Sequence, residues 1–529
     1  MDTDIIVIGS GAGGLAAALP LAQSGKRVTV IEQHNVPGGL CHSFRSGGYR
    51  YSPGIHYVGQ IGEGGFVRGL YEGLGVADDL TFYEMNPDGY EHVQIGNEHF
   101  DIPSGKLATI ERYKQRFPAD AKGIDDYFTL VEKICRQLPV VPETRTFLEF
   151  LTVPFRTREM GRYGLFSLKQ ILDSRINDPL LKAFLSIQCG DHGLPPSKTP
   201  FALHAAVAGH YLEGGYYPKG GGRAIPRAFV RALKKNGGRL MLSTSVEQIL
   251  TERQKGKVRA IGVRLADGTE IRANTVISNA SPNLTYEQLV GRDKLSHKLS
   301  QKLDKATYST AALVLYLATD LDLAGMGMDS GNYWYTASAD LEAYYQQTRQ
   351  RHILESDDCP GVFLGITTLK DPESFRNGHH TIEVVSFISY DLFRQWQQTK
   401  YQHRPEEYYA LKRKLSAAML KTVERIIPGI SDHLLHCELS TPLTNEHYVR
   451  STEGSCYGTE KTLRQIGPFG FNCRSEIDNL YLCGAGTTAH GLSGATTSGM
   501  GVAASLLGCR PSELLRKTGQ KLNVIPRKG

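Results

Sequence analysis

A glycine-rich turn near the start of the chain constrains the fold more than any other feature. Apolar residues 5–8 predict a short buried strand, and the run Gly9-Ser10-Gly11-Ala12-Gly13-Gly14 follows it directly. The Ala- and Leu-rich stretch up to Ser24 predicts a helix, and residues 27–31 predict a second strand that ends at Glu32. These parts form one βαβ unit of about 30 residues, in which the glycines permit a tight turn, close approach of a pyrophosphate and close helix packing.

The start of the predicted helix favours a dinucleotide. Its N–H groups and the positive end of its dipole suit phosphate oxygens. Glu32 is expected to accept hydrogen bonds from a ribose, which favours FAD or NAD over NADP. The candidate contacts in this unit are Gly9, Gly11, Ala12, Gly13, Gly14, Glu32 and Gln33. Pro20 lies beyond the first helical turn, so we expect the helix to kink or to end early there.

Three later segments extend the pattern. Pro37-Gly38-Gly39-Leu40 follows the acidic strand end, and Tyr51-Ser52-Pro53-Gly54-Ile55-His56-Tyr57 adds an aromatic strand end with a turn. In the middle of the chain, Gly214 to Gly222 precedes a predicted helix at 224–235 and predicted strands at 239–242 and 244–250. A hairpin turn at Asp267-Gly268 follows, and then a strand that ends at Ser278-Asn279-Ala280. Residues 479–483 predict another buried strand, followed by Gly484-Ala485-Gly486, the segment Gly491–Met500 and a helix to Leu507.

These segments resemble the phytoene desaturase and carotenoid isomerase family, with four strong patches at residues 4–59, 188–250, 275–280 and 479–507. Within it, Cys189–Pro196 and His210–Gly222 are most similar to the retinol saturase branch. The resemblance implies an α/β fold with a Rossmann-type FAD-binding domain of the amine-oxidase and carotenoid-desaturase superfamily and an inserted α+β substrate domain. The FAD-binding domain is expected at 1–75, 214–290 and 440–515, the substrate domain with a helical lid at 76–213 and 291–439, and a mobile basic tail at 516–529.

The same resemblance implies further FAD contacts. They are Gly38, Gly39, Leu40, Val246, Gly484, Ala485, Gly494, Ala495 and Thr496. The helix after Gly491 would point its N-terminus at the flavin pyrimidine ring, where its dipole stabilises negative charge.

The sequence offers few candidates for polar chemistry. His56 is one, because its segment follows the glycine pair and should return toward the flavin; Asp191 and His192 form a polar pair beside apolar helices. Tyr216, Tyr217 and Lys219 are candidate substrate contacts, although all six residues could instead be structural. No Ser-His-Asp triad motif or HExxH motif occurs, and no metal is expected.

We therefore expect an FAD-dependent oxidoreductase or isomerase that acts on C–C bonds of a long hydrophobic polyene, carotenoid- or retinoid-like. Saturation, desaturation and isomerisation stay open, as does an unsaturated fatty-acyl substrate. A non-catalytic prenyl-binding protein on the same fold, as in Rab GDP-dissociation inhibitors, is the alternative of another class. A second complete Gly-x-Gly-x-x-Gly unit is absent, so electrons must enter or leave by another route.

Composition narrows the setting. Nine cysteines without a CxxC pair favour a reducing, cytoplasmic environment. A net charge of +6 is too weak to indicate nucleic acid. The segment from Phe147 to Leu172 mixes aromatic residues with arginines, which is typical of an interfacial segment or of a lid packed on the core. Peripheral membrane contact is therefore expected alongside a hydrophobic small-molecule substrate.

Overall fold

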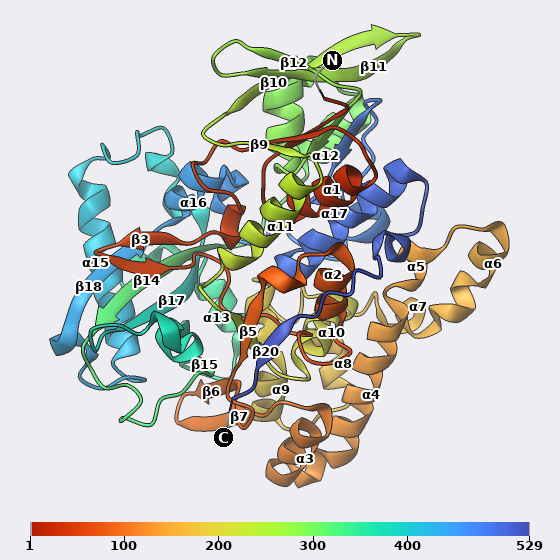
Figure 1. The fold of residues 1–529 in the computed structure, drawn as a ribbon. Helices are drawn as coiled ribbons and strands as arrows, with labels where there is room; N and C mark the ends of the chain where they lie inside the picture. Colours follow the sequence, from red (N-terminus) through yellow and green to blue (C-terminus); the bar gives the residue numbers. More distant parts are fainter. Residues whose placement is uncertain (1–2, 528–529) are drawn as a thin grey trace.

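A five-stranded parallel sheet forms the centre of one half of the molecule. The computed structural model describes residues 3–527, and the strand order is β19 (Leu480–Leu482), β13 (Thr275–Ser278), β1 (Ile5–Ile8), β2 (Val28–Ile31) and β9 (Arg239–Met241). The start, middle and end of the chain thus supply neighbouring strands, as the sequence predicts. Helices α1 (Ala12–Gln23), α11 (Ala224–Lys235) and α17 (Gly491–Leu507) pack together on one face (Figure 1).

Glycines permit the closest helix contact. A Cβ on Gly499 of α17 would lie 2.0 Å from the carbonyl oxygen of Gly13 in α1, and a Cβ on Gly14 would lie 2.1 Å from that of Gly9. Only glycine fits such distances. Of the two outcomes expected at Pro20, a kink or an early end, the early end is wrong, because the helix continues through Pro20 to Gln23.

A β-meander covers the other face of this sheet. It consists of β10 (Val246–Gln254), β11 (Lys257–Leu265) and β12 (Glu270–Arg272), and its apolar side packs on residues of β1 and β2. The expected turn at Asp267-Gly268 joins β11 to β12. A first turn, at residues 255–256, joins β10 to β11 and was not predicted.

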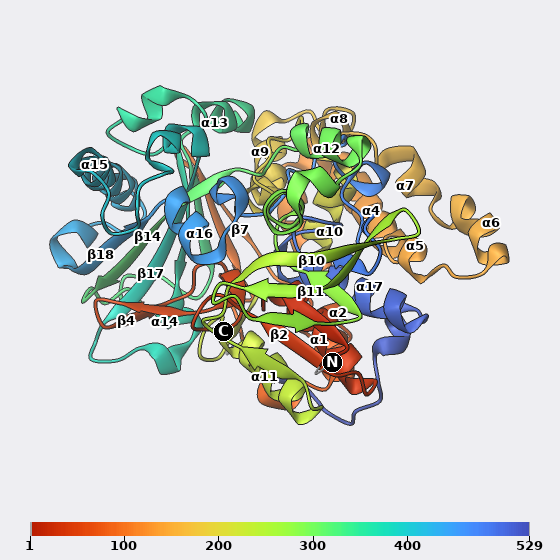
Figure 2. The same cartoon turned by 90° about the horizontal axis from the view of Figure 1, so that it is seen from above.

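The other half contains a seven-stranded mixed sheet. Its order is β18 (Leu434–Ser440), β14 (Ala311–Thr319), β17 (His380–Ile388), β16 (Gly361–Ile366), β15 (Asn332–Thr336), β6 (Glu91–Ile95) and β7 (Glu98–Ile102). Strand β14 is buried along its whole length because apolar clusters pack on both faces of the sheet. Figure 2 shows this sheet beside the helical block that runs from α4 to α10.

The remaining helices surround these sheets. They are α2 (Phe66–Leu74), α3 (Lys106–Arg116), α4 (Ala121–Gln137), α5 (Val140–Glu143), α6 (Phe147–Arg156), α7 (Arg158–Tyr163), α8 (Leu168–Asp173), α9 (Pro179–Ser186), α10 (Phe201–Tyr211), α12 (His297–Asp304), α13 (Leu341–Gln347), α14 (Thr367–Lys370), α15 (Glu406–Val423) and α16 (Pro442–Val449). Two strands, β3 (Phe44–Ser46) and β4 (Tyr49–Tyr51), form a hairpin.

The basic tail is not a free end over its described residues, which corrects the expectation. Strand β20 (Asn523–Ile525) pairs with β5 (Thr81–Glu84), which in turn pairs with β8 (Tyr216–Pro218). Leu522 is 3% exposed and joins the core, so apolar burial holds a segment that its charges alone would leave solvated.

Two further observations concern the setting of the protein. All nine cysteines are free. Among residues 3–527, no helix combines the length and the apolar character needed to cross a bilayer.

Candidate functional site

The glycine turn and Glu32 meet at the carboxyl ends of β1 and β2. Glu32 Oε2 accepts hydrogen bonds from the backbone N–H of Ser10 at 2.8 Å and from its hydroxyl at 2.7 Å, while Oε1 accepts from the His34 N–H at 2.9 Å. The buried carboxylate is therefore fixed beside the start of α1. This position suits the ribose role expected of it.

The second glycine pair lies against the first. A Cβ on Gly39 would lie 3.3 Å from the Cα of Gly11, and a Cβ on Gly54 would lie 3.1 Å from the Cβ of Leu40. Gly38 and Gly39 have φ values of 124° and 54°, which glycine adopts readily. The turns at 9–14, 38–40 and 54–56 therefore converge on one surface of the molecule.

The Asn279 side chain links the glycine turns to the segment that begins at Cys483, near the end of the chain. Sequence reasoning missed this role. A Cβ on Gly13 would lie 2.6 Å from Asn279 Oδ1 and 2.8 Å from the Gly484 backbone nitrogen. The thiol of Cys483 donates to the same Oδ1 at 3.5 Å. The position of Asn279 at the end of β13 was the available indication, since polar residues at the carboxyl ends of parallel strands face the ligand side of the sheet.

A buried lysine fixes the loop between β19 and α17. Lys461 Nζ donates to Thr459 Oγ1 at 2.7 Å and to the carbonyl oxygens of Ala485 and Thr487 at 2.7 and 2.9 Å. Burial lowers the pKa of Lys461 to about 7. Nothing in the local sequence distinguished this lysine from a surface one.

Other expected cofactor contacts lie around the same edge. Val246 is buried against β1 and β2 residues, whereas Gln33 is half-exposed and donates to the Tyr448 carbonyl at 3.3 Å. In the first two turns of α17, Gly494 and Ala495 are half-exposed, and Thr496 bonds back to the Leu492 carbonyl at 2.7 Å. Their roles toward a cofactor stay predictions.

His56 is held by an acid that the sequence did not reveal. His56 Nδ1 lies 2.9 Å from Glu383 Oε2, and the other oxygen of Glu383 accepts from the Ser52 N–H. The buried Lys370 donates to the His56 carbonyl at 3.0 Å, and burial lowers the pKa of this lysine to about 8. The carboxylate of β17 thus orients a histidine that belongs to the other half of the chain.

Asp191 and His192 have different partners, although they are adjacent. Tyr57 OH donates to Asp191 Oδ2 at 3.1 Å, whereas His192 Nε2 lies 3.3 Å from His204 Nδ1. Burial raises the pKa of Asp191 to about 7 and lowers that of His192. Asp191 therefore contacts Tyr57, which directly follows His56, whereas the His192 ring lies between those of His204 and His490.

His192 belongs instead to a buried group that sequence reasoning did not anticipate. Potential metal-ligand atoms of Cys189, His192 and His204 all lie within 4.8 Å of one another. The two imidazoles already contact each other, and His204 also bonds to Tyr127 at 3.0 Å.

The N-terminus of α17 reaches the Asp191 segment. His490 is the N-cap residue, and its Nε2 lies 2.9 Å from the Asp191 carbonyl oxygen. Tyr457 donates to the neighbouring Gly190 carbonyl at 2.8 Å. The helix expected to face the flavin ring and the inserted half of the chain therefore meet at Asp191.

A second buried acid, Glu91, was also missed. It accepts a hydrogen bond from Trp334 Nε1 at 2.6 Å, and its Oε1 is buried without a partner among the described residues. Burial, and secondarily repulsion by Asp191, raises the pKa of Glu91 to about 8. Alternation in β6 predicts burial at this position, but not that an acid occupies it.

The three residues expected to contact the substrate lie in different environments. Tyr216 and Tyr217 are buried in β8, with Tyr217 near Lys370. Lys219 faces solvent and forms an ion pair with Glu373 at 2.6 Å. The tyrosines stay candidates, whereas this ion pair directs Lys219 away from the buried surface.

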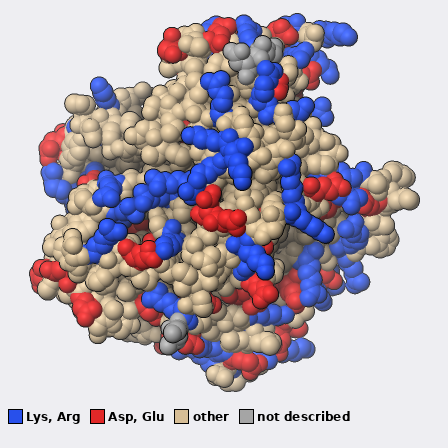
Figure 3. Space-filling view, in the orientation of Figure 1, with Lys and Arg blue, Asp and Glu red and all other residues tan. Residues whose placement is uncertain are grey.

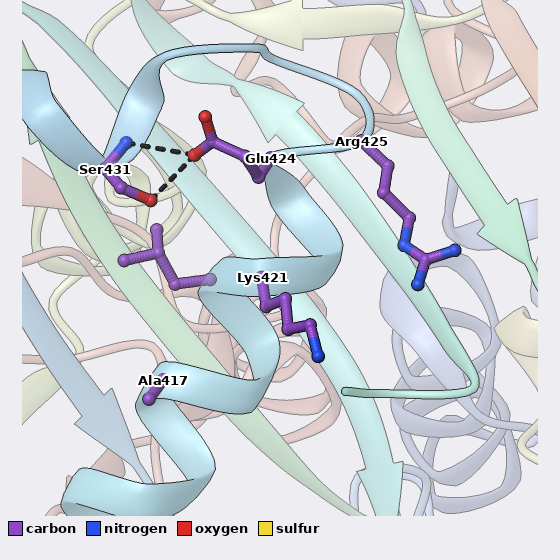
Figure 4. A pocket seen from close by; sticks show the side chains of 6 residues that line it. Ala417, Lys421, Glu424, Arg425 and Ser431 are labelled. Atoms are coloured by element: carbon purple, nitrogen blue, oxygen red, sulfur yellow. Dashed lines mark hydrogen bonds between the residues drawn. The ribbon is translucent and has the colours of Figure 1, made fainter. Parts of the chain in front are cut away.

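These residues fit a flavin dinucleotide. The glycine turns lie closely against one another, Glu32 is placed for a ribose, and the buried Nδ1 of His490 lacks a partner among the described residues. Two surface hollows lie elsewhere. One, of about 310 Å³, includes Arg259 and Asp478; the other, of about 360 Å³, lies on α15, where Glu424 accepts from Ser431 (Figure 4).

Comparison with known proteins decides the family. The model of flavin-containing amine oxidoreductases matches residues 12–507. The chain belongs to this family. It is therefore a flavin-dependent oxidoreductase, and the α/β fold expected from its sequence is confirmed.

Two relatives and one solved structure show what the chain is similar to within and beyond this family. The chain is 30% identical to an all-trans-retinol 13,14-reductase of Danio rerio, over 94% of this chain and 85% of the relative. It is 28% identical to a neurosporene-forming phytoene desaturase of Rhodobacter capsulatus, over 91% of this chain and 89% of the relative. An oxidoreductase of Methanosarcina mazei has the same fold, with a TM-score of 0.63 at 17% identity, over 96% of this chain and 100% of that one. The resemblance to the retinol saturase branch is confirmed.

Proposed function

We propose that this flavoprotein uses FAD to reduce a C=C bond of a long hydrophobic polyene of the retinoid or carotenoid class. The observation that carries the proposal is the meeting of Asp191 with Tyr57 and the start of α17. The near full-length likeness to a retinol reductase supports reduction over desaturation, which remains the second candidate.

Reduction of a double bond adds a hydride to one carbon and a proton to the other. FAD, held at the glycine turns and Glu32, would supply the hydride when bound and reduced. Asp191 would supply the proton, since its raised pKa keeps the carboxyl partly protonated near neutral pH. Because Tyr57 donates to Oδ2, the carboxyl proton would be carried on Oδ1. Tyr57, stacked on Tyr211 at 4.0 Å, would keep water away from this pair.

The test is a single turnover with the chemically reduced holoenzyme under anaerobic conditions. Retinol and a carotenoid should each be tried, and a product two hydrogens heavier is expected. Asp191→Asn should keep its flavin but react about 100-fold more slowly, the usual range for loss of a general acid. Asp126→Asn, at an exposed position on α4, is the matched control. A product two hydrogens lighter, formed in a parallel incubation with the oxidised holoenzyme, would favour desaturation. An unchanged rate in Asp191→Asn would exclude its proposed role.

We also propose that the substrate is taken from an anionic membrane surface. Helix α6 has no buried residue, and Phe147 and Phe155 are 74% and 83% exposed. It projects from the molecule with α5 and α7 (Figure 1). Of the segment expected to be a lid or an interfacial element, α8 packs on the core, and Met160 and Tyr163 of α7 are partly buried against it. Arg156, Arg158 and Arg162 accompany the exposed rings, a combination that suits headgroups and acyl chains.

Phe147→Ser with Phe155→Ser should weaken sedimentation with phosphatidylserine vesicles while leaving flavin content and stability unchanged, because α6 buries nothing. Phe469→Ser, which removes a 63% exposed phenylalanine outside this arm, is the control. If the unmodified protein does not sediment with these vesicles at low salt, the membrane proposal is wrong.

A further inference from the structure

We infer that a cluster of four arginines is the docking surface for an acidic one-electron carrier protein that reduces the flavin. The cluster consists of Arg45 in β3, Arg50 in β4, Arg223 and Arg227 at the start of α11. The inference rests on the proposed function, because each double-bond reduction consumes two electrons. The sequence contains one complete glycine-rich βαβ unit, which the flavin would occupy. The two electrons must therefore enter by a route other than a second dinucleotide-binding unit of this kind.

The four guanidinium groups lack carboxylate partners within residues 3–527. Arg45 donates to the Gly48 carbonyl at 3.2 Å and Arg223 Nε donates to that of Gly220 at 3.3 Å. Arg50 and Arg227 have no side-chain hydrogen bond or ion pair among the described residues. Arg264, by contrast, is paired with Glu270, as surface arginines in this protein often are.

The arginines also repel one another. Arg223 has its pKa lowered to about 10, first by burial and then by Arg50, Arg227 and Arg45. The pKa of Arg50 is lowered in the same way, and Asp371 is the acid that opposes both shifts. Bringing carboxylates to this cluster would relieve the repulsion through paired hydrogen bonds, which guanidinium groups form well.

The shape of the surface favours a protein over a small nucleotide. Figure 3 shows a band of basic side chains across the middle of this face, over the region of β3 and α11. The cluster is spread over a hairpin and a helix, and the two hollows described above lie elsewhere. A broad cationic surface steers an acidic protein toward itself and gives a rate that depends strongly on salt.

The cluster adjoins the segments that would hold the flavin. A Cβ on Gly222, just before α11, would lie 3.1 Å from the Cys41 carbonyl and 3.0 Å from Ile55 Cβ. Cys41 follows the second glycine pair, and Ile55 precedes His56. A carrier on these arginines would therefore sit against the proposed cofactor path. Two reduced carriers would each give up one electron and leave oxidised, and the oxidised flavin would gain both electrons together with protons from solvent.

The experiment measures both binding and electron transfer. Reduced plant-type [2Fe–2S] ferredoxin is the probe for anaerobic flavin reduction by stopped flow, and oxidised ferredoxin is the probe for binding to apoprotein and holoenzyme. For the variant Arg45→Glu/Arg227→Glu, both the association rate at low salt and flavin reduction should fall about tenfold or more. Arg50→Gln should give a smaller fall in both. Arg253→Glu/Lys257→Glu, at exposed positions of β10 and β11, makes the same change in net charge and should have little effect.

Four outcomes distinguish a failure of this inference from a failure of the proposed function. Equal losses in the cluster variant and in the control variant, or no binding of ferredoxin at any salt concentration, would overturn the docking surface. Faster flavin reduction by NADPH than by ferredoxin, with a dependence on Arg45 and Arg227, would also overturn it and indicate a nucleotide site. Turnover with dithionite should be unchanged in the cluster variant; if no variant or parent converts a polyene with dithionite, the proposed function fails instead.

Discussion

The glycine turns and the buried acids near Asp191 form two sides of the same candidate site by different means. Around Gly13 the missing Cβ lets the Asn279 side chain and the Gly484 backbone approach closely. Around Asp191 and Glu91 the surface is made of titratable side chains whose pKa values burial has raised. Changes on the first side should therefore alter cofactor loading at every pH. Changes on the second should leave the cofactor bound and alter pH dependence.

The largest effect is expected where helices α1 and α17 touch. In Gly499→Ala the new Cβ would lie 2.0 Å from the Gly13 carbonyl, so the helices must separate. We expect a loss of about 3 kcal/mol in the free energy of unfolding and protein purified without flavin. Denaturant unfolding and the flavin absorbance measure both. Gly69→Ala in α2 is the control, since nothing lies within 4 Å of its Cβ; a comparable loss there would break the distinction.

A smaller effect is expected at Glu91, and it should depend on pH. Because the folded pKa is raised to about 8 from 4.5, the folded protein keeps a proton that the unfolded chain releases. The contribution of Glu91 to the free energy of unfolding is complete below the pKa of the unfolded chain. It falls as pH rises from that pKa to the pKa of the folded protein. Glu91→Gln removes this fall, so its stability relative to the parent should improve by about 2 kcal/mol between about pH 5.5 and about pH 7.5.

Urea unfolding at several pH values would measure that difference. Flavin content should be the same in both proteins, because Glu91 lies outside the glycine turns. Parallel stability curves for the parent and Glu91→Gln would show that the acid titrates normally, and the contrast between the two sides would then fail.

The smallest effect is expected at Glu32. Glu32→Gln keeps a polar group beside Ser10 but loses the charge that strengthens hydrogen bonds to a ribose. FAD binding to apoprotein should weaken about tenfold, roughly 1.4 kcal/mol, in titrations followed by flavin fluorescence. Glu270→Gln, in the β-meander, should bind FAD normally. An unchanged affinity in Glu32→Gln would remove Glu32 from the cofactor contacts.

Local pattern was enough to predict the strands of the five-stranded sheet, whereas their assembly from distant parts of the chain was implied by the family resemblance. Strands at Ile5–Ile8 and Val28–Ile31 and the helix at Ala224–Lys235 follow from apolar runs, periodicity and glycine stops, all of which are contiguous in the sequence. Pro20 misled because a proline in the last turn removes one hydrogen bond without ending a helix whose burial is otherwise complete.

The polar side of the site could not be read in the same way. Glu383 reaches His56 across 327 residues, and Tyr57 reaches Asp191 across 134. Such pairs arise only when separate sheets and helices pack together, and neither partner carries a local motif. The tail misled for a related reason, because its charges are local whereas the partner of β20 is strand β5, near residue 81.

The strand order has a consequence for synthesis of the protein. The central strand β1 pairs on one side with β13, and β13 then awaits β19, which begins at residue 480. During translation β1 and β2 are made first, yet the sheet and its covering helix α17 can be completed only when nearly the whole chain has emerged. Until then an apolar strand edge stays open, which is a hazard for aggregation. We therefore expect the flavin to bind only after the chain has left the ribosome. Completion of the chain, rather than supply of the cofactor, would then commit the protein to its folded state.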